Sequence, residues 1–164
     1  MIERVAAASL RDLDALMALM DVSFPPEFGE GWTRAQLAGS LVGDTSSVYL
    51  ASSDGGDLGF SLCRNAGIEV ELLLIGVTPA ARGTGVGGRL IDAAVSDARA
   101  KGAEEMFLEV RANNAAAQRL YRSRAFHEVG RRVNYYAGTG GLRFDAITMR
   151  RILRPLDMVQ SANR

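Results

Sequence analysis

A glycine-rich segment, Gly83-Thr84-Gly85-Val86-Gly87-Gly88, is the clearest candidate for chemistry in this sequence. It follows an apolar run typical of a β-strand and precedes a pattern typical of a helix. Glycines let a ligand approach the backbone closely, and the unpaired amides at the start of a helix, together with its dipole, bind phosphate. The segment therefore indicates a site for a phosphorylated cofactor, with a glycine-rich turn that binds no ligand as the alternative.

Two common phosphate-binding motifs fit this segment poorly. Its glycine spacing matches the dinucleotide-binding fingerprint, but there the first glycine follows the strand almost directly, and here residues 78–82 intervene. The preceding segments also look like an antiparallel meander, where a parallel unit would be expected. The Gly-Lys-Ser/Thr of nucleoside-triphosphate loops does not occur in the segment.

Residues 77–87 as a whole, Val-Thr-Pro-Ala-Ala-Arg-Gly-Thr-Gly-Val-Gly, resemble the acetyl-CoA motif of the GNAT family of N-acetyltransferases. The resemblance implies that loop amides bind the CoA pyrophosphate and that the preceding strand pairs with the pantetheine arm. An asparagine after the next strand is also expected to contact the cofactor, unless it only caps a helix. The residues so expected to bind acetyl-CoA are Ile75, Val77, Arg82, Gly83, Thr84, Gly85, Val86, Gly87, Gly88 and Asn114.

Three further stretches narrow the resemblance to the RimI-type ribosomal-protein alanine N-acetyltransferases. They are Leu-Glu-Val-Arg-Ala-Asn-Asn-Ala-Ala-Ala-Gln-Arg-Leu-Tyr at 108–121, Arg-Arg-Val-Asn-Tyr-Tyr at 131–136 and Asp-Ala-Ile-Thr-Met at 145–149. Together with the glycine-rich segment they are four separate matches in register, and because the expected order of strands and helices is also that of the family, the resemblance covers nearly the whole chain. The resemblance implies direct acetyl transfer from acetyl-CoA to an amine, with the N-terminal α-amine of a ribosomal protein as the leading acceptor.

Acetyl transfer to an amine needs one group that takes a proton from the amine and another that protonates the departing thiolate. The resemblance implies that Tyr121 is the acid, and Glu109 is the candidate base. Glu69 and Glu71 share one face of the strand at 68–77. They are rival candidates for the base and could also hold a cationic acceptor.

The acceptor site is expected near Trp32, in a proline- and glycine-rich loop at 24–32, and near Tyr135. This sequence departs from its relatives here, because the loop is longer and Phe144 replaces a commonly acidic residue. Ala125 also stands where relatives usually carry glycine. The acceptor could therefore be a protein N-terminus, or it could be a lysine side chain or a small-molecule amine. A third hypothesis is a module that binds acetyl-CoA without turnover.

The elements that must position these residues can be read from periodicity and turn signals. Strands are expected at 2–6, 47–53, 58–64, 68–77, 105–111, 126–135 and 144–151, and helices from Ser9, at 33–41, at 85–101 and at 113–124. The order β-α-α-β-β-β-α-β-α-β-β predicts one α/β domain with a mixed, mostly antiparallel sheet of about seven strands flanked by four helices. We expect the domain over residues 1–152 and a flexible tail over 153–164.

Composition excludes several classes of site. One cysteine, Cys63, and one histidine, His127, exclude a disulfide framework and a multi-histidine metal centre, so no metal is expected. The sequence offers neither a signal peptide nor a long apolar run, which favours a cytoplasmic protein. We expect a monomer or homodimer that makes no direct contact with nucleic acid or a membrane.

The zero net charge of the chain hides a division between its halves. Residues 1–79 carry 4 basic and 11 acidic residues, a balance of −7, whereas residues 80–164 carry 15 and 8, a balance of +7. The basic half holds the proposed phosphate loop. The acidic half holds Glu27, Glu30, Glu69 and Glu71, which we expect to face a cationic acceptor.

Overall fold

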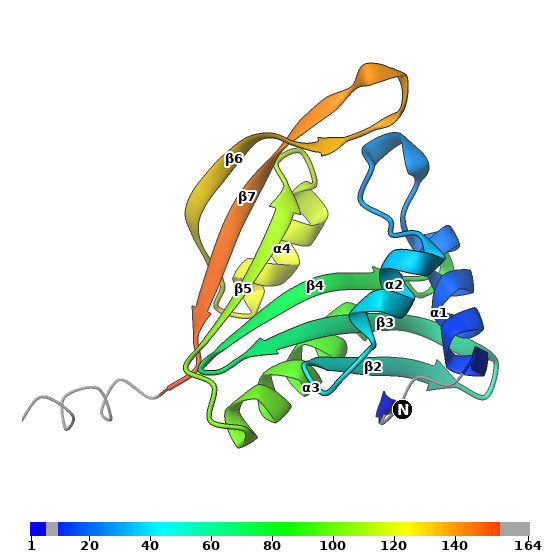
Figure 1. Cartoon of the computed structure of the whole chain (residues 1–164), viewed down its shortest axis with the longest axis vertical. Coiled ribbons are helices and arrows are strands. Elements are labelled where there is room, and N and C mark those ends of the chain that lie inside the picture. Colours follow the sequence, from blue (N-terminus) through cyan, green and yellow to red (C-terminus); the bar gives the residue numbers. More distant parts are fainter. Residues whose placement is uncertain (6–9, 155–164) are drawn as a thin grey trace, which may run out of the picture.

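The computed structural model of the chain describes residues 1–5 and 10–154. Its seven strands form one sheet in the order β1-β2-β3-β4-β5-β7-β6 (Figure 1). The strands are β1 Ile2–Val5, β2 Ser46–Ser53, β3 Gly56–Ala66, β4 Glu69–Val77, β5 Glu105–Arg111, β6 His127–Ala137 and β7 Arg143–Ile152. The helices are α1 Leu10–Ser23, α2 Arg34–Ser40, α3 Val86–Ala100 and α4 Ala115–Ser123. The predicted fold class and element order are confirmed.

The sheet divides where β4 and β5 part. These two strands are the parallel pair in an otherwise antiparallel sheet, and they pair only from Glu69–Leu72 to Glu105–Leu108. At the same point the β3–β4 register skips Leu73, which makes it the extra residue of a β-bulge. A bulge bends its strand and increases the local twist. Beyond it β5, β7 and β6 rise away from β4, as Figure 1 shows, so one edge of β4 is left without a strand partner.

Each face of the sheet has its own apolar core. Helices α1 and α2 bury residues such as Leu16 and Leu37 against Phe60 and Leu62 of β3. On the other face α3, joined by Tyr121 of α4, packs on the buried side chains of β4 and β5. Because the two helix layers cover opposite faces, any opening at the fork of β4 and β5 joins the two sides of the sheet.

Local sequence signals explain where the helices begin. The predicted capping box of α2 is present, with Thr33 Oγ1 accepting from the Gln36 amide and the Gln36 side chain accepting from the Thr33 amide. Asn114 caps α4 through its side chain. Ser9, the predicted cap of the first helix, lies outside the described residues.

Leu153, the residue after the expected end of the domain, packs against the rest of the structure. Leu153 is buried in the core, and its amide donates to the carbonyl of Glu104. It therefore belongs to the packed domain, whereas residues 155–164 of the predicted tail lie outside the described residues. Within the described part of the chain, no helix is both long and apolar enough to cross a lipid bilayer.

Ala125 occupies a backbone conformation that favours glycine. Its φ is +62°, in the turn between α4 and β6. An L-residue with a Cβ is strained there, whereas glycine is not.

Replacing Ala125 with glycine should therefore raise the free energy of unfolding by about 1 kcal/mol. Urea denaturation should show a higher midpoint with an unchanged slope. The matched control is Ala93→Gly inside α3, where glycine should cost about 1 kcal/mol. Equal destabilisation by both substitutions would contradict the assigned strain.

Candidate active site

A cleft of about 830 Å³ passes through the fork between β4 and β5. Its lining comes from both faces of the sheet. One wall is formed by the start of α3 and by α4, including Gly85, Asn114 and Tyr121. The opposite wall combines loop 24–32 with side chains from β4, β5 and β6. The cleft can thus accept two ligands that enter from opposite sides and meet at the fork.

The glycine-rich segment opens α3 at one end of this cleft. Gly83 and Gly85 have φ values of +76° and +85°, which favour glycine. A Cβ on Gly83 would meet no described atom within 4 Å, so packing does not require glycine there. Gly85 is the N-cap of α3 and has no side chain to cap the first amides. These amides are therefore free to bind an anion.

The side chains predicted for phosphate binding hold the loop itself. Arg82 donates through Nε to the carbonyl of Val77 and through Nη2 to that of Ser23, both at 3.2 Å. Thr84 Oγ1 donates to Ala81 at 2.7 Å, and Thr84 is the one residue of the segment 83–88 that does not line the cleft. Direct recognition of a phosphate is therefore left to the backbone amides of the loop, the groups that the resemblance implies.

The free edge of β4 continues this wall. Ile75 and Val77 line the cleft beyond the point where β5 leaves β4, so backbone groups there can pair with an extended ligand. Asn114 lines the same wall while its side chain accepts from the Ala117 amide at 3.1 Å. Its capping role is confirmed.

Tyr121 brings a phenol into the cleft from α4. The residue is buried, and its ring packs edge-on against Phe126 with the centroids 6.0 Å apart. Burial raises the pKa of the Tyr121 hydroxyl, and the charge of Glu30 raises it further. The hydroxyl therefore stays protonated at neutral pH and can serve as a proton donor.

Glu109 is the first residue of β5 beyond the fork, and it lines the cleft. Its side chain is 14% exposed. One oxygen accepts from Arg132 Nε at 2.7 Å, and the other accepts from the Thr148 hydroxyl at 2.8 Å. Both oxygens of this carboxylate are therefore held in place by hydrogen bonds at the fork.

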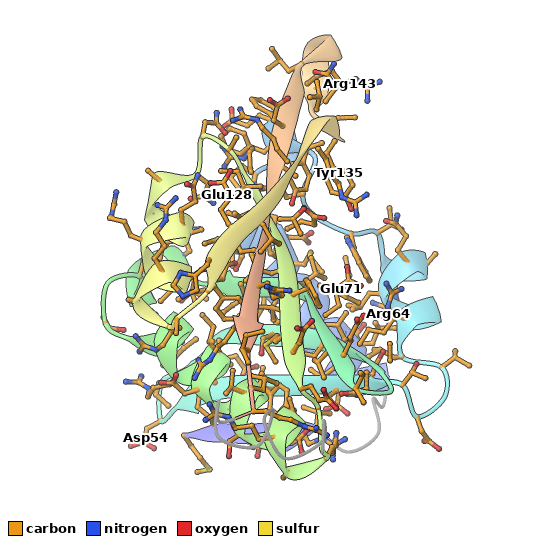
Figure 2. The ribbon with its side chains drawn as sticks, turned by 90° about the vertical axis from the view of Figure 1, so that its left-hand side faces the viewer. Asp54, Arg64, Glu71, Glu128, Tyr135 and Arg143 are labelled. Carbon is orange, nitrogen blue, oxygen red and sulfur yellow. The ribbon has the colours of Figure 1, made fainter. Side chains whose placement is uncertain are left out.

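The two rival glutamates of β4 fall in different places. Glu71 lines the cleft with its side chain 38% exposed and pairs with Arg64, the two side chains pointing toward one another in Figure 2. Glu69 is exposed at the base of the fork, where β4 is still paired with β5, and it does not line the cleft. The structure thus brings Glu71, but not Glu69, to the site.

Loop 24–32 and β6 bound the other end of the cleft. Trp32 and Tyr135 line it, as expected, together with Tyr136. The sequence did not indicate the ion pair found there, in which Arg111 Nε donates to Glu30 at 3.2 Å. These side chains are only 8% and 15% exposed. Nothing in the sequence marks Arg111 as buried, because the loop that covers it lies far away along the chain.

The charged residues around the cleft differ from the expectation that the acidic half of the chain makes one end of the site strongly negative. Glu27 is exposed and does not line the cleft. Glu30, Glu71 and Glu109 do line it, but each is paired with an arginine. The end of the cleft that is bounded by loop 24–32 and β6 is therefore less negative than the residue counts predicted. Within the residues that the structure describes, no cluster of three or more His, Cys, Asp or Glu side chains is placed to hold a metal ion.

Sequence comparisons place this arrangement among known proteins. Residues 13–126 match the sequence model of the acetyltransferase (GNAT) family. The chain is 31% identical over 114 residues to ribosomal protein bS18-alanine N-acetyltransferase of Haemophilus ducreyi, covering 68% of this chain and 79% of that protein. It is 43% identical over 108 residues to N-alpha-acetyltransferase RimI of Mycobacterium tuberculosis, covering 63% and 65%.

A comparison with solved structures agrees with the sequence matches. The crystal structure of the ribosomal-protein-S18-alanine N-acetyltransferase from Escherichia coli superposes with a TM-score of 0.81 at 29% identity. The match covers 94% of this chain and 96% of that one. The resemblance predicted from the sequence motifs is confirmed by these matches.

Several buried groups resist ionisation, and the stability of the fold should therefore decrease at alkaline pH. Burial raises the pKa of the Cys63 thiol to about 12, and it raises the pKa of the Tyr49, Tyr121 and Tyr136 hydroxyls above their usual value. In the unfolded chain the thiol ionises near pH 8.5 and tyrosines near pH 10. The stability that these groups contribute in their protonated form is fully present below the pKa values of the unfolded chain, and it is lost as pH rises above them.

The free energy of unfolding should therefore begin to fall above about pH 8.5 and fall more steeply above about pH 10. Urea denaturation at each pH measures this. Cys63→Ala removes the first contribution, so that variant should lose less stability between pH 8 and pH 10 than the wild type does. An identical pH dependence in the two proteins would refute the assignment to the thiol.

Proposed function

The chain belongs to the acetyltransferase (GNAT) family and is an N-acetyltransferase; on this premise we propose that it transfers the acetyl group of acetyl-CoA to the N-terminal α-amine of a ribosomal protein. The observation that carries the proposal is the two-sided cleft. Tyr121 enters it from α4, and Glu109 enters it from β5 at the fork. A proton donor and a proton acceptor thus border the same space, as amide formation requires.

The wall beside α3 fits acetyl-CoA. The free amides at the start of α3 suit its pyrophosphate, and the open space beside Gly83 leaves room for the approach. The free edge of β4 near Ile75 and Val77 can pair with the amides of the pantetheine arm. Acetyl-CoA, when bound, supplies an acetyl group activated as a thioester.

The side chains at the fork divide the proton transfers. Glu109 takes a proton from the acceptor amine, directly or through a water molecule, because an ammonium has no lone pair with which to attack. Tyr121 donates its hydroxyl proton to the departing sulfur, and burial keeps that proton in place until then. Glu109 is a better placed base than Glu71, because it is the more buried of the two and lies at the fork.

A protein N-terminus as acceptor is supported by relatives such as those of Haemophilus ducreyi and Escherichia coli, which are named as alanine N-acetyltransferases of a ribosomal protein. The end of the cleft bounded by loop 24–32 and β6 would receive it. Because ribosomal proteins are made in the cytoplasm, this acceptor would place the enzyme there. We expect the acetyltransferase domain to occupy the packed region that ends near Leu153, and to act as a monomer or homodimer.

Thiol release from acetyl-CoA tests the proposal. A peptide that begins Ala-Arg and carries an internal lysine should be acetylated at its α-amine, with the site located by mass spectrometry. The same peptide with a blocked α-amine is the control and should give no release. Acetylation of the lysine or of small amines instead would favour an enzyme whose acceptor is a lysine side chain or a small-molecule amine. Cofactor binding without release for any amine would favour a binding module.

Tyr121→Phe should lower kcat about 100-fold or more, because phenylalanine keeps the ring packing but has no proton to donate. The dissociation constant for acetyl-CoA, measured by calorimetry, should hardly change. Tyr49→Phe is the control, since its hydroxyl donates to Asp97 away from the cleft, and it should keep the wild-type kcat. A wild-type kcat for Tyr121→Phe would exclude Tyr121 as the acid.

Glu109→Gln should also lower kcat about 100-fold, because the amide cannot accept a proton from the amine. Glu105→Gln is the matched control. Glu105 lies on the same face of β5 and pairs with Arg150, yet does not line the cleft. If Glu71→Gln gave the large loss in steady-state kinetics while Glu109→Gln did not, the base would be Glu71.

A further inference from the structure

Two segments that depart from the family pattern contact each other at the acceptor end of the cleft. The Phe28 ring of loop 24–32 packs edge-on against Phe144 of β7, with the centroids 5.6 Å apart. The backbones also touch. A Cβ on Gly29 would lie 2.0 Å from the Ala137 carbonyl oxygen, and one on Gly138 would lie 2.1 Å from that of Glu27. The loop and the tip of the β6–β7 hairpin, at the upper end of Figure 1, therefore form one continuous wall.

Arg111 lies inside this wall. Its guanidinium carbon is 3.6 Å from the centre of the Phe28 ring, and Nη1 donates to Asn113. Nε donates to Glu30, which joins the end of β5 to the loop. A guanidinium this deeply buried needs an anionic partner, so the ion pair fixes Glu30 at the edge of the cleft.

Of the three carboxylates that line the cleft, Glu30 is the one that is both largely buried and hydrogen-bonded through a single oxygen. Both oxygens of Glu109 are engaged, at 2.7 and 2.8 Å. Glu71 also pairs through one oxygen, but its side chain is 38% exposed. Glu30 is largely desolvated and meets Arg111 through Oε1 alone, at the longer distance of 3.2 Å. Glu30 and Tyr121 line the same cleft, and the charge of Glu30 adds to the rise that burial gives the pKa of the Tyr121 and Tyr136 hydroxyls.

We propose that Glu30 binds the positively charged α-amine of the acceptor and thereby determines which acceptors enter, while Glu109 removes the proton. This inference rests on the proposed function and adds the group that recognises the amine. An ammonium can donate the hydrogen bonds that Glu30 Oε2 is still able to accept. The acetylated product has lost that positive charge, so it is held less tightly and leaves the site.

Charge-specific binding separates this role from a structural one. With CoA present, calorimetry compares an alanine-starting peptide with its Nα-acetylated form. Glu30→Gln should weaken binding of the free-amine peptide at least about 10-fold while changing binding of the acetylated peptide little. Glutamine can still accept from Arg111, so the wall stays closed. Glu27→Gln, an exposed acidic residue of the same loop, is the matched control and should change neither affinity.

Each other outcome overturns the inference. Equal weakening of both peptides would mean that Glu30 only supports the loop, and no weakening would mean that it does not bind the acceptor. Glu30→Asp keeps the charge and should retain part of the preference for the free amine. If the wild-type enzyme acetylates the peptide but Glu30→Gln behaves like wild type, this inference fails and the proposed function stands. If the wild type neither binds nor acetylates any peptide, both fail.

Discussion

The parting of β4 from β5 is the constraint on which the rest of the site depends. The two strands share only the pairs from Glu69–Glu105 to Leu72–Leu108, and the bulge at Leu73 then turns β4 away. The separation costs backbone hydrogen bonds along one edge of β4, which a bound ligand can restore. It also joins the faces covered by α3 and α4 on one side and by loop 24–32 on the other. Without it the proton donor of α4 and the carboxylate of β5 would lie on opposite sides of a closed sheet.

Electrostatic pairing keeps several charges near this opening without leaving a large net charge. Arginines accompany Glu30, Glu71 and Glu109, and two of these carboxylates are mostly buried. A buried carboxylate without a partner would be expensive, and a partner lowers that cost without removing the capacity to accept further hydrogen bonds. The pairs differ in how completely they satisfy the carboxylate. That difference lets neighbouring glutamates take different parts in recognition and proton transfer.

Local signals allowed much of the fold to be predicted from the sequence. The glycines at 83 and 85, the capping box at Thr33 and the cap at Asn114 each depend on residues close along the chain. Comparison with the family pattern marked Ala125 as standing where relatives usually carry glycine, and the structure shows the left-handed conformation there. The ion pair of Glu30 with Arg111, the contact of Phe28 with Phe144 and the exclusion of Glu69 from the cleft could not be predicted. They arise only when the fork and the β6–β7 hairpin bring distant segments together.

A crystal structure with a bisubstrate analogue, in which CoA is joined through an acetyl bridge to the α-amine of an alanine-starting peptide, tests the central claim most directly. The account predicts that the CoA moiety lies along α3 and the free edge of β4, and that the peptide lies between loop 24–32 and β6. The bridging carbon should lie at the fork, bordered by Tyr121 and Glu109. A bridge lying away from the fork, or both moieties on one face of the sheet, would contradict the account.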